Sequence, residues 1–131
     1  KYLTTAEEGE LRNHVYELLD DKASNIDTDL VLVLRYINSF DGIKTISSCY
    51  GHGLDLPPFI KLRYNEGWVP LIDRLKTTIT KLMPGVICLA NSDHLCIEYD
   101  TTENCLDFYK HRELFWNIIV SFFQELRNIG L

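Results

Sequence analysis

The sequence predicts one α+β domain over residues 1–131, built on a four-stranded, mostly antiparallel sheet with helices packed on one face. Three observations predict this class. Apolar residues recur with helix or strand periodicity in the order α-α-β-β-α-β-β-α. The last six segments form two successive β-β-α units, after two N-terminal helices. Each pair of strand segments is joined by a polar or glycine-containing loop, which suits antiparallel neighbours.

The first predicted helix runs from about Ala6 to Lys22. It opens with a capping box, in which Thr5 is followed three residues later by Glu8. The apolar residues that follow form one helical stripe. Acidic residues gather in the first turn, where they complement the helix dipole.

The second predicted helix lies within the segment "NIDTDLVLVLRYINSFDGI". Asp27 or Thr28 can cap its N-terminus, and Gly42 is positioned to stop it. Its apolar residues recur with helical spacing, so one face is predicted to point inward. The residues predicted on this face are Leu30, Val33, Leu34 and Ile37.

Two strands follow, in "IKTISSC" (43–49) and "PPFIKLRY" (57–64). In the second, Ile60, Leu62 and Tyr64 alternate with Phe59, Lys61 and Arg63, an alternation that is typical of a strand with one buried face. Pro57 and Pro58 are placed before this strand, because proline cannot donate a ladder hydrogen bond.

A third helix is predicted in "GWVPLIDRLKTTITKLMPG", with Pro70 in its first turn and Pro84 and Gly85 after its end. The residues predicted to share its buried face are Leu71, Ile72, Leu75, Ile79 and Leu82. A hairpin then follows, with strands at 86–90 and 95–99 and a polar turn at 91–94.

The last helix is predicted from about Phe108 to Asn128. Its apolar positions are too many for one stripe, so the helix is either central in the fold or half-buried in an oligomer. These positions are Leu114, Phe115, Ile118, Ile119, Phe122, Phe123 and Leu126. We therefore predict a homodimer formed through this helix.

Overall charge and composition limit the function. The net charge of −6 argues against general nucleic-acid binding, which depends on clustered Lys and Arg. No apolar run approaches about 18 residues, so no membrane association is expected. The four cysteines come without a visible secretory signal. We expect a cytoplasmic protein with reduced thiols.

The segment "TISSCYGHG", residues 45–53, is the most unusual stretch. Gly51 and Gly53 allow positive φ and close approach of a ligand to the backbone, and successive N–H groups in such a turn can form an anion-binding nest. Hydroxyl groups and an imidazole surround these glycines, as recognition of a phosphate or ribose would require. The alternative is a tight loop whose polar side chains satisfy its own backbone. The other predicted ligand-binding residues of the loop are Ser47, Ser48, Cys49, Tyr50 and His52.

Further ligand contacts are predicted outside this loop. Lys61 and Arg63 alternate on one sheet face and could meet phosphates, although a solvated strand face is the alternative. Trp68 could stack on a base, as could Tyr50 or Phe59, whereas a packing role at the helix start is the alternative for Trp68. Asn91 and His94 belong to the second hairpin turn, which could lie at the same sheet edge as the loop.

Chemistry at the loop is the alternative to simple binding. Cys49 could act as a nucleophile with His52 as its base, which would make an enzyme that cleaves a nucleotide. The pairs Cys49/His52 and His94/Cys96 do not form a strong zinc signature, so no metal and no cofactor is expected. No glycine-rich phosphate-binding or zinc-protease motif occurs. An enzyme is therefore less expected than a binding protein.

The segment "TISSCYGHG…PPFIKLRY" resembles a loop-and-strand motif of small phage and bacterial proteins. More remotely, its "SSC-x-G" portion resembles the first motif of the wybutosine-synthesis methyltransferase family of tRNA modification, although His52 stands where that family has arginine. That family implies an α+β fold with a ligand site at this loop. The phage resemblance implies a different role, a sponge that sequesters a nucleotide immune signal in the host cytoplasm. The signal would be a cyclic oligonucleotide or an ADP-ribose derivative, and tRNA modification remains the alternative.

Overall fold

The computed structural model describes residues 28–53, 56–100 and 108–131. The first predicted helix and its capping box lie outside the described residues. The elements are α2 (Thr28–Asn38), β1 (Ile43–Cys49), β2 (Phe59–Tyr64), the short 3-10 helix η1 (Glu66–Trp68), α3 (Val69–Leu82), β3 (Val86–Ala90), β4 (His94–Tyr99) and α4 (Phe108–Asn128). Both predicted β-β-α units are present, in the predicted order.

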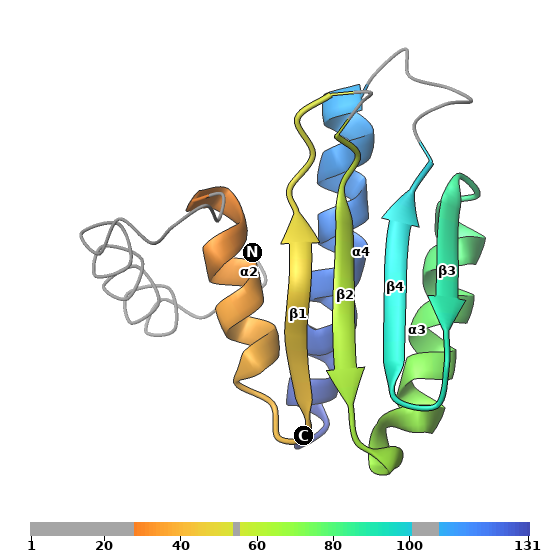
Figure 1. Cartoon of the computed structure of the whole chain (residues 1–131). Helices are drawn as coiled ribbons and strands as arrows, with labels where there is room; N and C mark the ends of the chain where they lie inside the picture. The colour runs from red at the N-terminus through yellow and green to blue at the C-terminus, as the bar shows by residue number, and fades with distance from the viewer. Residues whose placement is uncertain (1–27, 54–55, 101–107) are drawn as a thin grey trace.

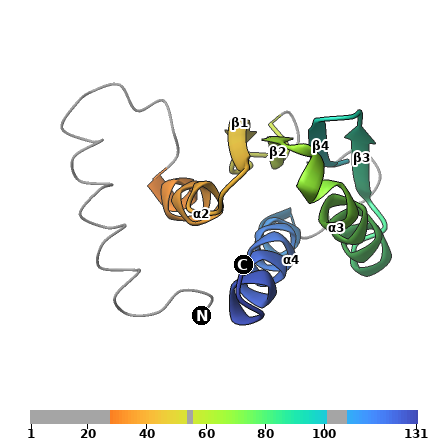
Figure 2. The same cartoon turned by 90° about the horizontal axis from the view of Figure 1, so that it is seen from below.

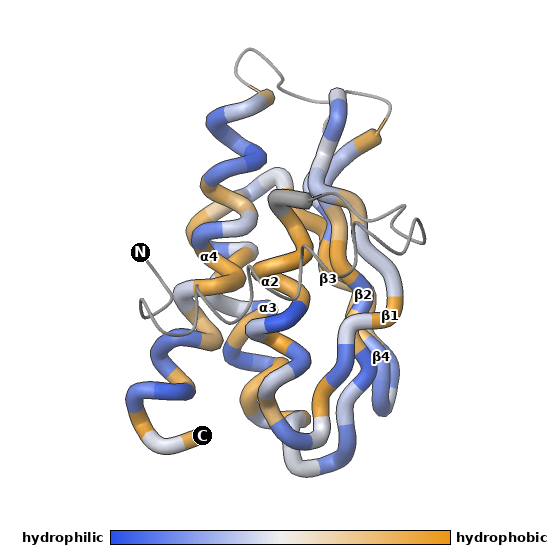
Figure 3. Tube along the Cα trace, turned by 90° about the vertical axis from the view of Figure 1, so that its left-hand side faces the viewer, coloured by the Kyte–Doolittle hydropathy of each residue, from blue (hydrophilic) through white to orange (hydrophobic). Residues whose placement is uncertain are grey.

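The four strands form one antiparallel sheet with the order β1-β2-β4-β3 (Figure 1). Figure 2 shows α2, α3 and α4 on the same face of the sheet, with no described element on the other face. Alternate strand residues, such as Ile60, Leu62 and Ile97, are fully buried beneath these helices. Apolar residues gather between the sheet and the helices (Figure 3). The predicted α+β class with helices on one face is confirmed.

Helix α2 begins at Thr28, and its predicted apolar face is buried, with Leu30 and Ile37 almost inaccessible. The helix ends at Asn38, and the chain then turns into β1 through Gly42. Gly42 has a φ of +82°, and a Cβ atom there would overlap the Asn65 side chain. Glycine is therefore required at this turn.

Helix α4 lies beneath the middle of the sheet, between α2 and α3 (Figure 2). This central position explains its wide apolar surface, because Phe115, Ile119 and Phe123 are completely buried within one chain. Of the seven apolar positions named in the sequence, Leu114 alone is exposed, at 41%. The aromatic content of α4 therefore gives no reason to expect a dimer through this helix.

The predicted buried face of α3 is confirmed at Ile72, Leu75 and Ile79. Leu82 is 57% exposed, contrary to the prediction, whereas the next residue, Met83, is 4% exposed and continues the buried face, because each residue turns the helix by about 100°. No helix of the described residues is both long and apolar enough to cross a membrane.

Candidate functional site

The loop that follows β1 is held against α4. The Tyr50 carbonyl accepts a hydrogen bond from Trp116 Nε1 at 2.9 Å, and the Gly51 carbonyl accepts one from Arg112 Nη1 at 2.8 Å. The Arg112 guanidinium also lies 4.2 Å from the centre of the Tyr50 ring. The Tyr50 ring is in turn stacked on Trp116. Two α4 side chains therefore fix the loop on the helix.

Several backbone groups of this loop make contacts within the chain. Gly51 has a φ of +106°, and a Cβ atom there would lie 3.0 Å from Pro58 Cδ and 3.2 Å from Arg112 Cδ. The N–H of His52 donates to the Leu56 carbonyl at 2.9 Å. Gly51 is thus required for close packing against α4, and these groups are already paired within the chain. These contacts pair the Tyr50 and Gly51 carbonyls and the His52 N–H within the chain, as expected where a loop satisfies part of its own backbone.

Replacing Trp116 with phenylalanine tests this anchoring. The change leaves the Tyr50 carbonyl without its donor, so the free energy of unfolding should fall by about 1–3 kcal/mol. Trp68→Phe is the matched control, because Trp68 Nε1 donates to the Asp41 carbonyl at 2.8 Å elsewhere in the molecule. Amide hydrogen exchange at 50–53 should accelerate in Trp116→Phe alone. Equal acceleration in both variants would contradict local anchoring.

The two hairpin connections lie at opposite ends of the sheet. Cys49 pairs with Phe59, which pairs with Glu98, whereas Arg63 at the other end of β2 pairs with His94. Because β4 runs antiparallel to β2, the β3–β4 turn lies beside the start of β1 rather than its end (Figure 1). The expectation that Asn91 and His94 lie near the 45–53 loop is therefore wrong.

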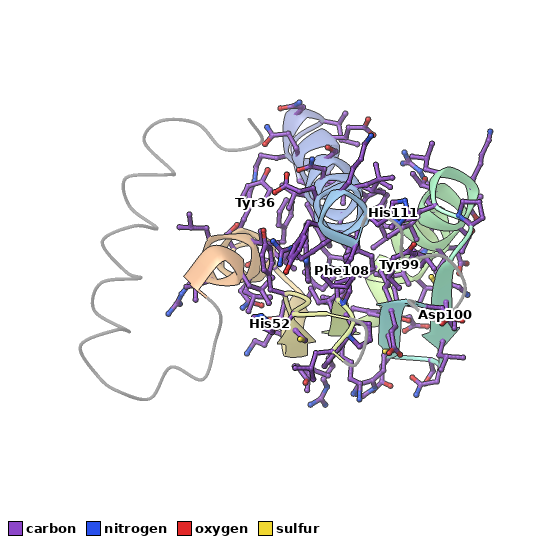
Figure 4. The ribbon with its side chains drawn as sticks, turned by 90° about the horizontal axis from the view of Figure 1, so that it is seen from above. Tyr36, His52, Tyr99, Asp100, Phe108 and His111 are labelled. Carbon is purple, nitrogen blue, oxygen red and sulfur yellow. The ribbon has the colours of Figure 1, made fainter. Side chains whose placement is uncertain are left out.

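Figure 4 shows the loop end of the molecule. His52 lies over β1, whereas Tyr99 and His111 lie on the other side of Phe108. The Tyr99 hydroxyl and His111 Nδ1 are 2.8 Å apart, so these two groups are hydrogen-bonded to each other. The histidines at this end therefore belong to two separate environments.

Five predicted ligand-binding residues share the sheet face that no described helix covers, which we call the open face. The strand pairing places Ser47 opposite Lys61, Cys49 opposite Phe59, and Arg63 opposite His94. Ser48 is paired with the buried Ile60 and lies on the helix-covered face. The strand residues of the open face are Lys44, Ser47, Cys49, Phe59, Lys61, Arg63, His94, Cys96, Glu98, Ile87 and Leu89.

Three cations of the open face, Lys44, Lys61 and Arg63, lie close together on β1 and β2. Lys44 on β1 is directly opposite Arg63 on β2. Lys61 precedes Arg63 by two residues on β2, so the two side chains are on the same face. Within the described part of the chain, no carboxylate lies within ion-pair distance of any of the three. Like charges placed opposite each other destabilise an antiparallel pair. An anion bound between them would relieve this repulsion.

Lys44 and Arg63 also line a depression with a volume of about 990 Å³. Amide and hydroxyl groups are available around them as hydrogen-bond partners. Carboxylates line this depression as well, so it is mixed in charge rather than uniformly basic. Its polar lining consists of Asn38, Asp41, Asn65, Glu66, Ser92 and Asp93.

The β3–β4 turn beside this depression is shaped by its own side chains. Asn91 Oδ1 accepts hydrogen bonds from the backbone N–H groups of Asp93 and His94, at 3.1 and 2.9 Å. His94 Nδ1 lies 2.6 Å from Asp93 Oδ1. The side-chain amide oxygen of Asn91 thus shapes the turn, while the His94 ring stays partly exposed on the open face.

Two of the three aromatic candidates are occupied by packing. Trp68 is 6% exposed and packs against Phe40 and Phe123, so the alternative packing role is the one that the structure shows. Tyr50 is half-buried between Arg112 and Trp116. Phe59, half-buried on the open face, is the aromatic residue that a base could reach there.

Three of the four cysteines lie among the described residues. Cys49, Cys88 and Cys96 are free cysteines, and Cys105 lies outside the described residues. Burial raises the pKa of the Cys96 thiol, which Lys61 lowers and Glu98 raises to smaller extents. This thiol is therefore protonated at neutral pH and is a poor nucleophile. No group of three potential metal ligands occurs among the described residues.

No protein-family model, curated protein or solved structure matches this chain. Sequence reasoning placed Lys61 and Arg63 on the open face but missed the pairing of Lys44 with Arg63, which depends on strand register. It also missed Arg112 and Trp116, which hold the loop, because their role depends on how α4 packs beneath the sheet.

Proposed function

We propose that this protein binds a small phosphate-bearing ligand of the nucleotide class on its open face and leaves the ligand chemically unchanged. The observation that carries this proposal is the Lys44–Arg63 cross-strand pair, which has no carboxylate partner among the described residues. A planar guanidinium can donate two parallel hydrogen bonds to one phosphate, and a neighbouring ammonium adds a further charge-assisted contact.

The rest of the open face suits the other parts of a nucleotide. Lys61 extends the positive charge along β2, and Ser47, directly opposite it, offers a hydroxyl group to a ribose. Phe59 stands two residues beyond Lys61, and stacking of a base on such a ring contributes about 1–3 kcal/mol. The ligand would thus lie along β2, with phosphates near Arg63 and the base near Phe59.

The cellular role that we propose for this binding is sequestration of a nucleotide immune signal by a phage or prophage protein. The signal would be a cyclic oligonucleotide or an ADP-ribose derivative. This role is supported by the resemblance of residues 45–64 to small phage and bacterial proteins.

Thermal shift and titration calorimetry against cyclic dinucleotides, cyclic trinucleotides and ADP-ribose test the proposal. At a ligand concentration a hundredfold above Kd, binding should stabilise the native protein by about 2.7 kcal/mol. Arg63→Ala removes a charged donor, so its affinity should fall by about 10- to 100-fold, the equivalent of about 1.5–3 kcal/mol. Lys81→Ala, which removes an exposed cation from α3, is the matched control and should bind normally.

His52→Ala distinguishes the open face from the loop. His52 lies at the other end of the sheet from Arg63, so this variant should retain the native affinity. Loss of binding in His52→Ala with retention in Arg63→Ala would move the site to the loop. A panel without any response would contradict binding of these nucleotides altogether.

A further inference from the structure

The two edge strands of the sheet differ in how their outer edges are protected. At the β1 edge, the Thr45 N–H donates to Asn38 Oδ1 of α2 at 2.8 Å, and the pairing register shifts between Thr45 and Ser47. A bulge and a covering side chain are common ways of blocking further strand addition. The β3 edge has neither device. Its sequence, "VICLA", is free of charges and proline, and its pairing with β4 shows no register shift.

The hydrogen bonds of the β3–β4 hairpin show which backbone groups of β3 face outward. The Asp100 N–H donates to the Gly85 carbonyl at 2.8 Å, and the Asn91 N–H donates to the His94 carbonyl at 3.0 Å. Because pairing alternates in an antiparallel ladder, Ile87 and Leu89 also face β4, whereas Val86, Cys88 and Ala90 direct their backbone groups outward.

Most of these outward groups lack a partner. The Val86 N–H is taken by the Met83 carbonyl at 3.0 Å. Within the part of the chain that the structure describes, the N–H and carbonyl groups of Cys88 and Ala90 have no hydrogen-bond partner. In Figure 1 no described strand lies beyond β3 in the plane of the sheet. The edge can therefore accept another strand.

We propose that this strand is β3 of a second copy, paired antiparallel about a two-fold axis at Cys88. In this register the two Cys88 residues exchange two hydrogen bonds. Each Ala90 N–H donates to the carbonyl of the partner's Val86, which uses the outward groups and spares the occupied Val86 N–H. The two four-stranded sheets become one continuous sheet. The interface differs from one formed through α4, whose apolar residues are buried within the chain.

The side chains favour a second copy over an unrelated strand, because the pattern of β3 is complementary to itself. Ile87 and Leu89, the sequence neighbours of Cys88, lie on the open face and are 45% and 68% exposed. The two-fold axis places each Ile87 opposite the partner's Leu89, in a non-hydrogen-bonded pair where side chains approach most closely. β3 carries no charge, so no like charges are opposed.

Sedimentation of the full chain over a range of concentrations tests this interface. The native chain should reach the dimer mass at high concentration. Ala90→Pro removes an outward N–H without removing a bond to β4, so it should sediment as a monomer with an unchanged far-ultraviolet spectrum. Ala90→Ser retains the N–H and should dimerise like the native chain.

A charge pair tests the register. Leu89→Lys alone places an ammonium opposite the partner's Ile87 and should weaken dimerisation. Ile87→Glu combined with Leu89→Lys places opposite charges face to face twice in this register and should restore the dimer. A native chain that stays monomeric, an Ala90→Pro dimer, or a double variant no better than Leu89→Lys would each overturn the proposal. None of these results depends on ligand binding.

Discussion

Replacing Phe123 with alanine is expected to lower the free energy of unfolding by about 3–5 kcal/mol. Phe123 is completely buried, and its ring centre lies 5.4 Å from that of Phe40 and 6.1 Å from that of Trp68. It thus joins α4 to the segment after α2 and to η1. The loss combines the transfer of a large side chain with the cavity that remains. Urea denaturation followed by circular dichroism measures it.

Leu114→Ala is the matched control for this prediction. Both residues lie on α4 and both belong to its predicted apolar set, but Leu114 is 41% exposed. Its replacement should lower the free energy of unfolding by less than about 1 kcal/mol, because the partly exposed Leu114 side chain buries little apolar surface in the native protein. Similar losses in the two variants would contradict the central position of α4.

Lys44→Glu should have opposite effects on stability and binding. The new carboxylate stands opposite Arg63 and replaces a like-charge pair with an attractive one, so the free energy of unfolding should rise by about 0.2–1 kcal/mol. The same change removes the Lys44 ammonium, which would contact a phosphate, and its new carboxylate neutralises the charge of Arg63, the other phosphate donor. Affinity for ADP-ribose or a cyclic dinucleotide should fall by about 100-fold or more.

Lys81→Glu is the control for the change in net charge, because Lys81 is exposed on α3, away from the open face. It should leave both affinity and stability close to the native values. If Lys44→Glu destabilised the protein and kept its affinity, the cation pair would have a structural role rather than a binding role.

The secondary structure could be predicted closely where periodicity and chain breakers agree. β1, β3 and α4 have the predicted bounds. Gly42 and Gly85 directly precede β1 and β3, and the helical spacing of the apolar residues marks α4. The arrangement of the hairpins could not be predicted, because the order β1-β2-β4-β3 depends on which strands pair across the two units. This order separates the 45–53 loop from the Asn91–His94 turn.

The candidate site could be predicted only in part. Alternation along β2 is enough to place Lys61 and Arg63 on one face, because side-chain direction in a strand is a local property. The position of Lys44 opposite Arg63 depends on pairing, which the irregularity between Thr45 and Ser47 shifts. The local sequence around Trp68 likewise suits either packing in the core or stacking on a ligand base. Its contacts with Phe40 and Phe123 show that it packs in the core.

An amide chemical-shift titration of the native chain with ADP-ribose, and separately with a cyclic dinucleotide, tests the central claim most directly. We predict that at least one of them shifts a contiguous set of signals from Lys44, Lys61 and Arg63, with saturation, and that Lys44→Glu abolishes these shifts. Shifts confined to residues 50–53, or no shifts with either nucleotide, would contradict a nucleotide site on the open face.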